Sequence, residues 1–96
     1  MPWNNPNSYP FNQQGVMQAP ARSGVYALYT SQQWIYVGES NDIQRRLLEH
    51  LRGDNPCITR SRPTSFSYEL CDENQRVARQ NQLIVELRPT CNQMLG

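Results

Sequence analysis

Two short apolar runs in the first half of the chain predict a β-hairpin. Residues 24–30 and 33–38 are rich in aliphatic and aromatic side chains, and a short polar stretch separates them. Apolar runs of this length joined by so few polar residues are typical of paired antiparallel strands. Each run carries a tyrosine close to a glycine, and these tyrosines are Tyr26 and Tyr36. Because side chains alternate faces along a strand, we expect both tyrosines to project from the same side of the hairpin.

A helix is expected directly after the hairpin. Residues 39–42 offer several side chains suited to an N-cap, and Gly53 is a suitable residue to end the helix. The apolar stripe of this helix consists of Ile43, Leu47 and Leu51, with Leu48 at its margin. Arg46 and His50 lie one turn apart at the border of the stripe, so we expect them to reach the cleft between helix and sheet.

The second half of the chain predicts one further strand and one further helix. Residues 57–63 are expected to form an irregular basic loop, and residues 64–71 alternate apolar and polar side chains as a third strand would. The second helix should start at residues 72–74 and end before Pro89. Its inward face is expected to hold Val77, Leu83, Ile84 and Leu87, with the polar Gln80 at the same angle. The sequence therefore predicts an α+β fold, a small three-stranded antiparallel sheet flanked by helices.

The first 22 residues differ in composition from the rest. They are rich in Pro, Asn, Gln and Ser, so they cannot build a core by themselves. Their aromatic residues Trp3, Tyr9 and Phe11 favour an extended N-terminal arm that lies over a domain formed by residues 23–96. Aromatic residues in such a tail also serve as contacts for a partner.

The overall charge is close to balanced. The formal net charge of +1 argues against strong non-specific binding to a polyanion. However, all nine basic residues are arginines, and five of them fall close together: Arg45, Arg46, Arg52, Arg60 and Arg62. Arginine suits bidentate contacts to phosphate, which indicates a local basic face. A compositional bias against lysine explains the same arginines equally well.

The length of 96 residues fits a single domain. No apolar run is long enough for a transmembrane helix, and the N-terminus lacks an apolar signal core, so we expect a cytoplasmic protein with no membrane partner. The cysteines Cys57, Cys71 and Cys91 are odd in number and widely spaced. We expect them to be reduced, partly buried thiols rather than a disulfide or a zinc site.

Several short motifs follow one another in a recognisable order. The chain contains Gly24-Val25-Tyr26, Tyr36-Val37-Gly38, then Arg46 and His50 on the predicted helix, and finally Pro89-Thr90-Cys91-Asn92. This arrangement over about residues 23–93 resembles the GIY-YIG endonuclease superfamily. The resemblance implies hydrolysis of phosphodiester bonds in DNA with one divalent cation, Mg²⁺ or Mn²⁺, and no nucleotide cofactor.

The resemblance also implies roles for individual residues. The catalytic set would be Tyr26, Tyr36, Arg46, His50 and Asn92, with Gly24 and Gly38 structural at the site. One of the two tyrosines would take a proton from water, and the spacing leaves open which one. Arg46 would favour the phenolate or clamp the developing negative charge.

The resemblance leaves two possible roles for His50, which are to relay the proton or to hold a tyrosine in place. Asn92 would support the site by hydrogen bonding. Gly38 would let the backbone and the first helix approach closely.

One position departs from the family pattern. The metal-binding glutamate of the family lies three residues before a Leu-Ile pair and nine before the proline, and both counts reach Gln80. A carboxamide is a much weaker ligand for a hard cation than a carboxylate. We therefore expect metal binding and the reaction rate to be severely reduced in this chain.

Three functional hypotheses follow. The first is an active nuclease of which this chain is an inactivated copy carrying glutamine in place of glutamate. The second is a naturally silent module that binds DNA or a protein partner. The third is a small interaction domain in which the tyrosine pair is accidental.

DNA is the expected partner in the first hypothesis and one of the two partners open in the second. Arg45, Arg52, Arg60 and Arg62 are the candidate contacts to DNA, and residues 54–63 are the candidate DNA-contacting insertion. A homodimer would allow so small a nuclease to cut two strands, and the alternative is a nuclease that nicks DNA or recognises its structure. Some family members have a lysine where this chain has Glu39, which removes a phosphate contact, whereas His50 resembles the restriction-enzyme branch.

Overall fold

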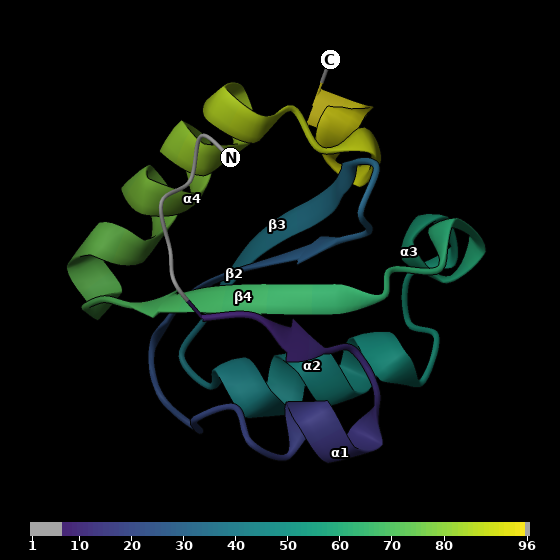
Figure 1. The fold of residues 1–96 in the computed structure, drawn as a ribbon. Coiled ribbons are helices and arrows are strands. Elements are labelled where there is room, and N and C mark those ends of the chain that lie inside the picture. The colour runs from purple at the N-terminus through teal and green to yellow at the C-terminus, as the bar shows by residue number, and fades with distance from the viewer. Residues whose placement is uncertain (1–6, 96) are drawn as a thin grey trace.

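A four-stranded antiparallel sheet forms the centre of the molecule within residues 7–95, the part of the chain that this computed structural model describes (Figure 1). Its strands are β1 (Tyr9–Pro10), β2 (Gly24–Tyr29), β3 (Trp34–Ser40) and β4 (Ser65–Leu70). The order in the sheet is β1-β4-β2-β3, so β2 is central and β3 is an edge strand. The predicted hairpin and the predicted third strand are confirmed.

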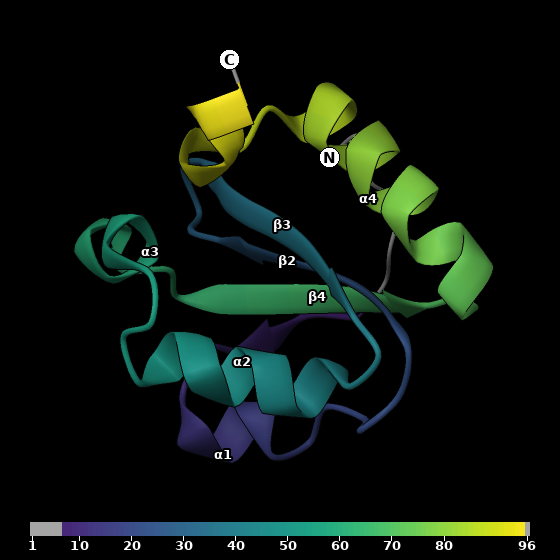
Figure 2. The same cartoon turned by 180° about the vertical axis from the view of Figure 1, so that it is seen from behind.

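Helices cover both faces of the sheet. They are α1 (Gln13–Val16), α2 (Ile43–Leu51), α3 (Pro56–Ser61), α4 (Glu73–Leu87) and the 3₁₀ helix η1 (Thr90–Leu95). Figure 1 and the opposite view in Figure 2 show α1 and α2 on one face and α4 on the other. None of the helices within residues 7–95 is long and apolar enough to cross a membrane.

Two apolar clusters separate the sheet from its helices. The cluster under α1 and α2 contains fully buried side chains from β2, β3, β4 and both helices, among them Tyr26, Leu28, Ile35, Leu47 and Phe66. The cluster under α4 consists of Val25, Ala27, Val37, Leu83 and Leu87. The alternation along β2 therefore sends Tyr26 towards α2 and its neighbours towards α4.

The sheet has four strands and not the three predicted from the sequence, because the N-terminal segment supplies one. Tyr9 and Pro10 pair with Phe66 and Ser65 of β4. The Tyr9 ring stacks on Phe66 with a centroid distance of 5.4 Å. The short helix α1 then buries Val16 in the cluster under α2. Residues 7–22 are thus part of the fold, whereas Trp3 lies outside the described residues.

The prediction of a basic loop at residues 57–63 is wrong, because most of this segment belongs to helix α3. Asn55 caps this helix by accepting hydrogen bonds from the backbone N–H groups of Cys57 and Ile58. Pro56 occupies the first helical turn, where its missing N–H costs nothing. These local signals, and the burial of Ile58, favour a helix over a loop.

The cysteines also differ from the prediction. Cys57 and Cys91 form a disulfide with a Cα–Cα distance of 5.8 Å, and Cys71 is free. The bridge joins α3 to the segment that follows α4. The expectation of three reduced thiols is therefore wrong for Cys57 and Cys91, because the fold brings together two residues that lie 34 positions apart.

Helix α4 faces the sheet with fewer apolar residues than predicted. Leu83 and Leu87 are buried as expected, but Val77 is 55% exposed. The first half of α4 is instead fastened by ion pairs, Arg76 to Glu39 of β3 at 2.7 Å and Arg79 to Glu69 of β4 at 2.8 Å. Arginine stems therefore cover this end of the sheet in place of an aliphatic side chain.

Candidate active site

The two motif tyrosines lie on the same side of the hairpin, as predicted. Their ring centroids are 6.3 Å apart. The pairing of β2 with β3 shifts between Leu28 and Tyr29, and next to this irregularity Ile35 and Tyr36 both pack against the cluster under α2. Tyr26 pairs with Gly38 and Leu28 pairs with Tyr36 in regular register, so ordinary alternation already places Tyr36 on the face that holds Tyr26. The irregularity turns Ile35 towards that face as well.

Glycine is required at position 38 because Tyr26 fills the space beside it. A Cβ atom built at Gly38 would lie 2.4 Å from the Tyr26 hydroxyl oxygen. The prediction that Gly38 admits the first helix is therefore wrong, since the Tyr26 side chain makes the close approach. At Gly24 a Cβ would lie 2.3 Å from the carbonyl oxygen of Glu69, so this glycine allows close packing of β2 against β4.

His50 connects the tyrosines to α2. Its ring is buried, with Nε2 2.8 Å from the Tyr26 hydroxyl and Nδ1 2.9 Å from Oδ1 of Asp54. The ring also packs edge-on against Tyr36, with centroids 5.2 Å apart and planes at 67°. The position at the border of the α2 stripe therefore places His50 in contact with both tyrosines.

Asp54 is a site residue that the sequence reasoning missed. Gly53, with a φ of +89°, ends α2, and the N–H groups of Gly53 and Asp54 bond to the carbonyls of His50 and Glu49. This pattern is a Schellman motif, which returns the chain to the last helical turn. A carboxylate directly after a helix-ending glycine, four residues beyond the histidine, was the signal that could have found it.

Arg46 shares Asp54 with His50. Its Nη1 donates to Oδ2 of Asp54 at 2.6 Å and to Oε1 of Glu49 at 2.7 Å. The side chain is 34% exposed, so the guanidinium stays accessible at the edge of the cluster. Arg46, Asp54, His50 and Tyr26 thus form one continuous chain of hydrogen bonds from the surface to the core.

Burial has a large effect on the protonation of these hydrogen-bonded side chains. Burial and then the neighbouring Tyr36 raise the pKa of Tyr26 well above its usual value, although Arg46 acts to lower it. Burial lowers the pKa of His50, against the opposing effect of Asp54. Burial acts to raise the pKa of Asp54, but hydrogen bonds from Arg46 and His50 outweigh it and lower the pKa. At neutral pH, Tyr26 and His50 are therefore neutral and Asp54 is charged.

The Asn92 side chain forms two hydrogen bonds with the backbone of the second triplet, Tyr36-Val37-Gly38. Its Oδ1 accepts from the Val37 N–H at 2.8 Å, and its Nδ2 donates to the Val37 carbonyl at 3.0 Å. The side chain is buried, and Val37 lies between Tyr36 and Gly38 on the edge strand. The amide of Asn92 therefore pairs with the free edge of β3 as another strand would.

Gln80 lies on α4, on the other face of the sheet from α2. Its side chain is half-buried, and its hydrogen bond within the described residues is to Asn81, at 3.4 Å. Within residues 7–95 there is also no group of three or more His, Cys, Asp or Glu side chains that could hold a metal ion. The donor groups present therefore do not fit a hard divalent cation, which prefers several carboxylate oxygens.

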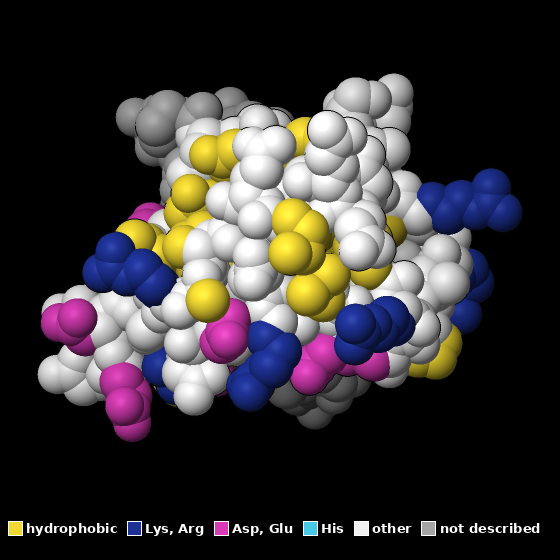
Figure 3. Space-filling model, turned by 90° about the horizontal axis from the view of Figure 1, so that it is seen from below, with side chains coloured by type: hydrophobic (Ala, Val, Ile, Leu, Met, Phe, Trp, Pro, Cys, Tyr) yellow, Lys and Arg dark blue, Asp and Glu magenta, His cyan; other side chains and the backbone are white. Residues whose placement is uncertain are grey.

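The arginines proposed to contact DNA are exposed but do not form a patch of one sign. Arg45 and Arg52 lie on or next to α2, and Arg60 and Arg62 lie on or next to α3. Figure 3 shows the face formed by α1 and α2, on which arginine and acidic side chains are interspersed. This mixture agrees with the small net charge of the sequence.

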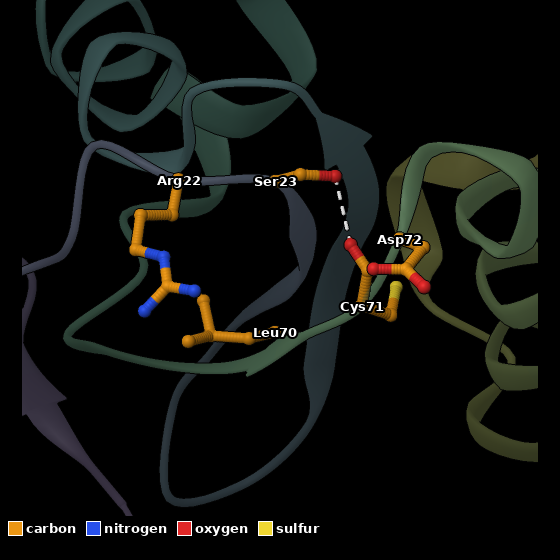
Figure 4. A pocket seen from close by; sticks show the side chains of 5 residues that line it. All are labelled: Arg22, Ser23, Leu70, Cys71 and Asp72. Atoms are coloured by element: carbon orange, nitrogen blue, oxygen red, sulfur yellow. Dashed lines mark hydrogen bonds between the residues drawn. The ribbon is translucent and has the colours of Figure 1, made fainter.

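A pocket of about 210 Å³ lies away from the tyrosine cluster. It is lined by Arg22, Ser23, Leu70, Cys71 and Asp72, where β2 begins and β4 ends (Figure 4). The Ser23 hydroxyl donates to the Cys71 carbonyl across it, and burial raises the pKa of the Cys71 thiol. A protonated thiol is a poor nucleophile, so the hydrogen-bonded cluster is the better candidate for chemistry.

A known domain family matches most of this chain. A family model described as the GIY-YIG catalytic domain matches residues 22–92, which include both triplets, α2 and Asn92. The chain belongs to the GIY-YIG family. No curated protein sequence matches this GIY-YIG domain significantly.

Solved structures share the fold of this GIY-YIG domain. The N-terminal endonuclease domain of UvrC from Thermotoga maritima, bound to its catalytic magnesium, superposes with a TM-score of 0.75 at 22% identity, covering 83% of this chain and 93% of that one. A mutant of the same domain with asparagine replaced by alanine, bound to its catalytic divalent cation, gives 0.74 at 21% identity, with coverage of 82% and 91%. The α+β fold is therefore that of a GIY-YIG endonuclease domain.

Proposed function

We propose that this chain is a GIY-YIG nuclease domain that acts on DNA, and that Gln80 disables its metal-dependent hydrolysis. The observation that carries the proposal is the continuous chain from Arg46 through Asp54 and His50 to Tyr26, beside the half-buried Tyr36. A cationic clamp next to two tyrosines suits a phosphodiester, whose reaction builds negative charge on the phosphoryl oxygens.

Tyr36 is the better candidate for activating water. Tyr26 is completely buried, and its pKa is raised well above the usual value, mainly by burial. A phenol in that environment neither meets a water molecule nor releases its proton easily. Tyr36 remains partly exposed on the same face, so it can contact a water molecule beside a bound phosphate.

His50 holds a tyrosine in place and does not relay protons to solvent. Both of its ring nitrogens already have partners, Tyr26 and Asp54, and the residue is only 2% exposed. Its edge-on contact with Tyr36 orients that ring as well. Of the two roles open for this histidine, the structure supports positioning.

Arg46 would bind the phosphate. Its guanidinium is held by Asp54 and Glu49 but stays partly exposed, so its remaining N–H groups can donate to a phosphoryl oxygen. The exposed Arg45, Arg52, Arg60 and Arg62 would contact the DNA backbone on either side. Binding should therefore weaken as salt concentration rises.

The test compares cleavage by this chain and by Gln80→Glu. The substrates are duplex, nicked, flapped, branched and single-stranded DNA, with Mg²⁺ or Mn²⁺. The matched control is Gln75→Glu, which adds the same charge at an exposed position of α4. We expect only Q80E to cut DNA and to bind Mn²⁺ more tightly than the other two chains.

The result also distinguishes the second candidate function. The glutamine at position 80, where the family has a glutamate, is the observation that favours a silent DNA-binding module. That function predicts no cleavage by Q80E and equal DNA affinity with and without Mg²⁺. Cleavage products report the number of strands cut, and sedimentation of the DNA complex reports whether the chain acts as a homodimer. Absence of both cleavage and DNA binding would refute both functions.

A further inference from the structure

One carboxylate connects Arg46 and His50 of α2. Oδ1 of Asp54 lies 2.9 Å from Nδ1 of His50, and Oδ2 lies 2.6 Å from Nη1 of Arg46. The Schellman motif at Gly53 places the backbone of Asp54 against the last turn of the helix. The position of the carboxylate therefore follows from the helix end and does not depend on a flexible loop.

This contact determines which nitrogen of His50 carries the proton. An ionised carboxylate only accepts hydrogen bonds, so Nδ1 must be the donor towards Asp54. In a neutral imidazole the other nitrogen is then an acceptor, which leaves Nε2 to accept from the Tyr26 hydroxyl. The hydrogen bonds of this cluster can all form only if Tyr26 donates to His50 and His50 donates to Asp54.

We propose that Asp54 is the positioning residue of this site, which fixes the orientation and tautomer of His50 and holds Arg46 beside it. His50 in turn directs the Tyr26 hydroxyl and supports the Tyr36 ring. Asp54 thus sets the geometry of both the phosphate clamp and the tyrosines without touching substrate. Its relevance to catalysis rests on the proposed nuclease function, whereas its hold on His50 does not.

The charged and titratable neighbours of His50 come from β2, β3, α2 and the residue that follows the end of α2. They are Tyr26 on β2, Tyr36 on β3, Arg46 and Glu49 on α2, and Asp54 after it. Arg46 opposes a positive charge on His50, whereas Glu49 and Asp54 favour it. Only Asp54 bonds to the ring at Nδ1, so only its removal should change the tautomer.

The chain is well suited to a direct test, because His50 is its only histidine. Long-range ¹H–¹⁵N NMR spectra of the imidazole show which nitrogen carries the proton. In the parent chain we expect Nδ1 to be protonated and Nε2 to be bare at pH 7.5. In Asp54→Ala, Nδ1 loses its acceptor, and we expect a substantial population with the proton on Nε2.

Two further variants separate the charge of Asp54 from its shape. Asp54→Asn keeps an oxygen that can accept from Nδ1, so the tautomer should persist, while the loss of the negative charge should make His50 titrate at lower pH than in the parent. Glu49→Gln removes the other carboxylate bound to Arg46, and the tautomer should stay that of the parent. Backbone amide spectra check that every variant is folded.

The proposal is overturned if D54A keeps a single Nδ1-protonated tautomer, or if E49Q changes the tautomer as much as D54A does. The kinetic arm uses the Q80E background, where D54N should lower kcat by about 100-fold with little change in KM, because its amide nitrogen cannot accept the hydrogen bond that positions Arg46. If Q80E is inactive, the proposed function fails while the NMR spectra still decide the role of Asp54. Unchanged kcat in D54N with active Q80E would limit Asp54 to a structural role and refute the catalytic part.

Discussion

The bond between Asn92 and the edge of β3 can be tested by substitution. Asn92→Ala removes two hydrogen bonds and leaves the N–H and the carbonyl of Val37 without their partners. Each buried group left without a partner costs about 1–3 kcal/mol. Because β3 is an edge strand that water can partly reach, we expect a loss of about 2–4 kcal/mol in the free energy of unfolding.

Asn92→Asp tests the geometry more sharply. The substitution keeps the acceptor for the Val37 N–H but places a second oxygen opposite the Val37 carbonyl. At pH 7 the new carboxylate should destabilise the fold at least as much as N92A does. When protonated it can donate to that carbonyl, so its pKa in the folded state should lie above the unfolded value of about 4. The deficit is then full above the folded pKa and disappears as the pH falls to the unfolded one.

Urea unfolding monitored by tryptophan fluorescence, at several pH values between 7 and 4 with the disulfide intact, measures these differences. Asn81→Ala, at an exposed position of α4, is the matched control and should change stability by less than about 0.5 kcal/mol. The reasoning is wrong if N92A unfolds at the same urea concentration as the parent. It is also wrong if the difference between N92D and the parent does not depend on pH.

Three further changes test other parts of the structure. Gly38→Ala should lower stability by about 1–3 kcal/mol in thermal unfolding, because the new methyl group meets the Tyr26 hydroxyl, and an unchanged melting temperature would contradict this packing. Reduction of the bridge between Cys57 and Cys91, which closes a loop of 34 residues, should cost about 4 kcal/mol in urea unfolding, and equal midpoints with and without reductant would argue against the bridge. The lowered pKa of His50 means that the unfolded chain takes up a proton first, so stability should fall as pH drops below about 6.5 until the folded pKa is reached. His50→Gln should lack this dependence between pH 7.5 and 5, and a parent chain with flat stability there would refute a buried neutral histidine.

Local patterns were sufficient for most of the regular structure. The hairpin, α2, β4 and α4 each carry a period or a cap that spans several residues. Strand β1 has only two residues, and it exists because Tyr9 stacks on β4, which no local pattern shows. Helix α3 was predictable in hindsight, since Asn55 and Pro56 are a cap and a first-turn proline.

Features that depend on distant contacts were less accessible. The approach of Cys57 to Cys91 is set by the fold between them. The exposure of Val77 follows because Arg76 and Arg79 pair with glutamates on the sheet and cover that end of it. Helical periodicity predicts which side of α4 faces inward, but not where ion pairs replace aliphatic contact.

In the candidate site, too, some features follow from local sequence patterns and others depend on distant contacts. The triplets and the helix pattern predict that Tyr26, Tyr36, Arg46 and His50 come together, because each lies at a fixed place on an element. Their different burial depends on the whole molecule, so the sequence could not distinguish the two tyrosines. Asp54 required a specific reading of the helix end, where glycine reverses the chain towards the histidine.

Because of the disulfide between Cys57 and Cys91, the structure near the site depends on the redox conditions around the protein. It joins α3 to the residue directly before Asn92, whose side chain holds the second triplet. In an oxidising compartment the covalent link and the two hydrogen bonds act together on β3. Under the reducing conditions of a cytosol such bridges open, and Asn92 is then held by hydrogen bonds alone. The thiol reagent in the buffer therefore determines which form of the site an assay measures.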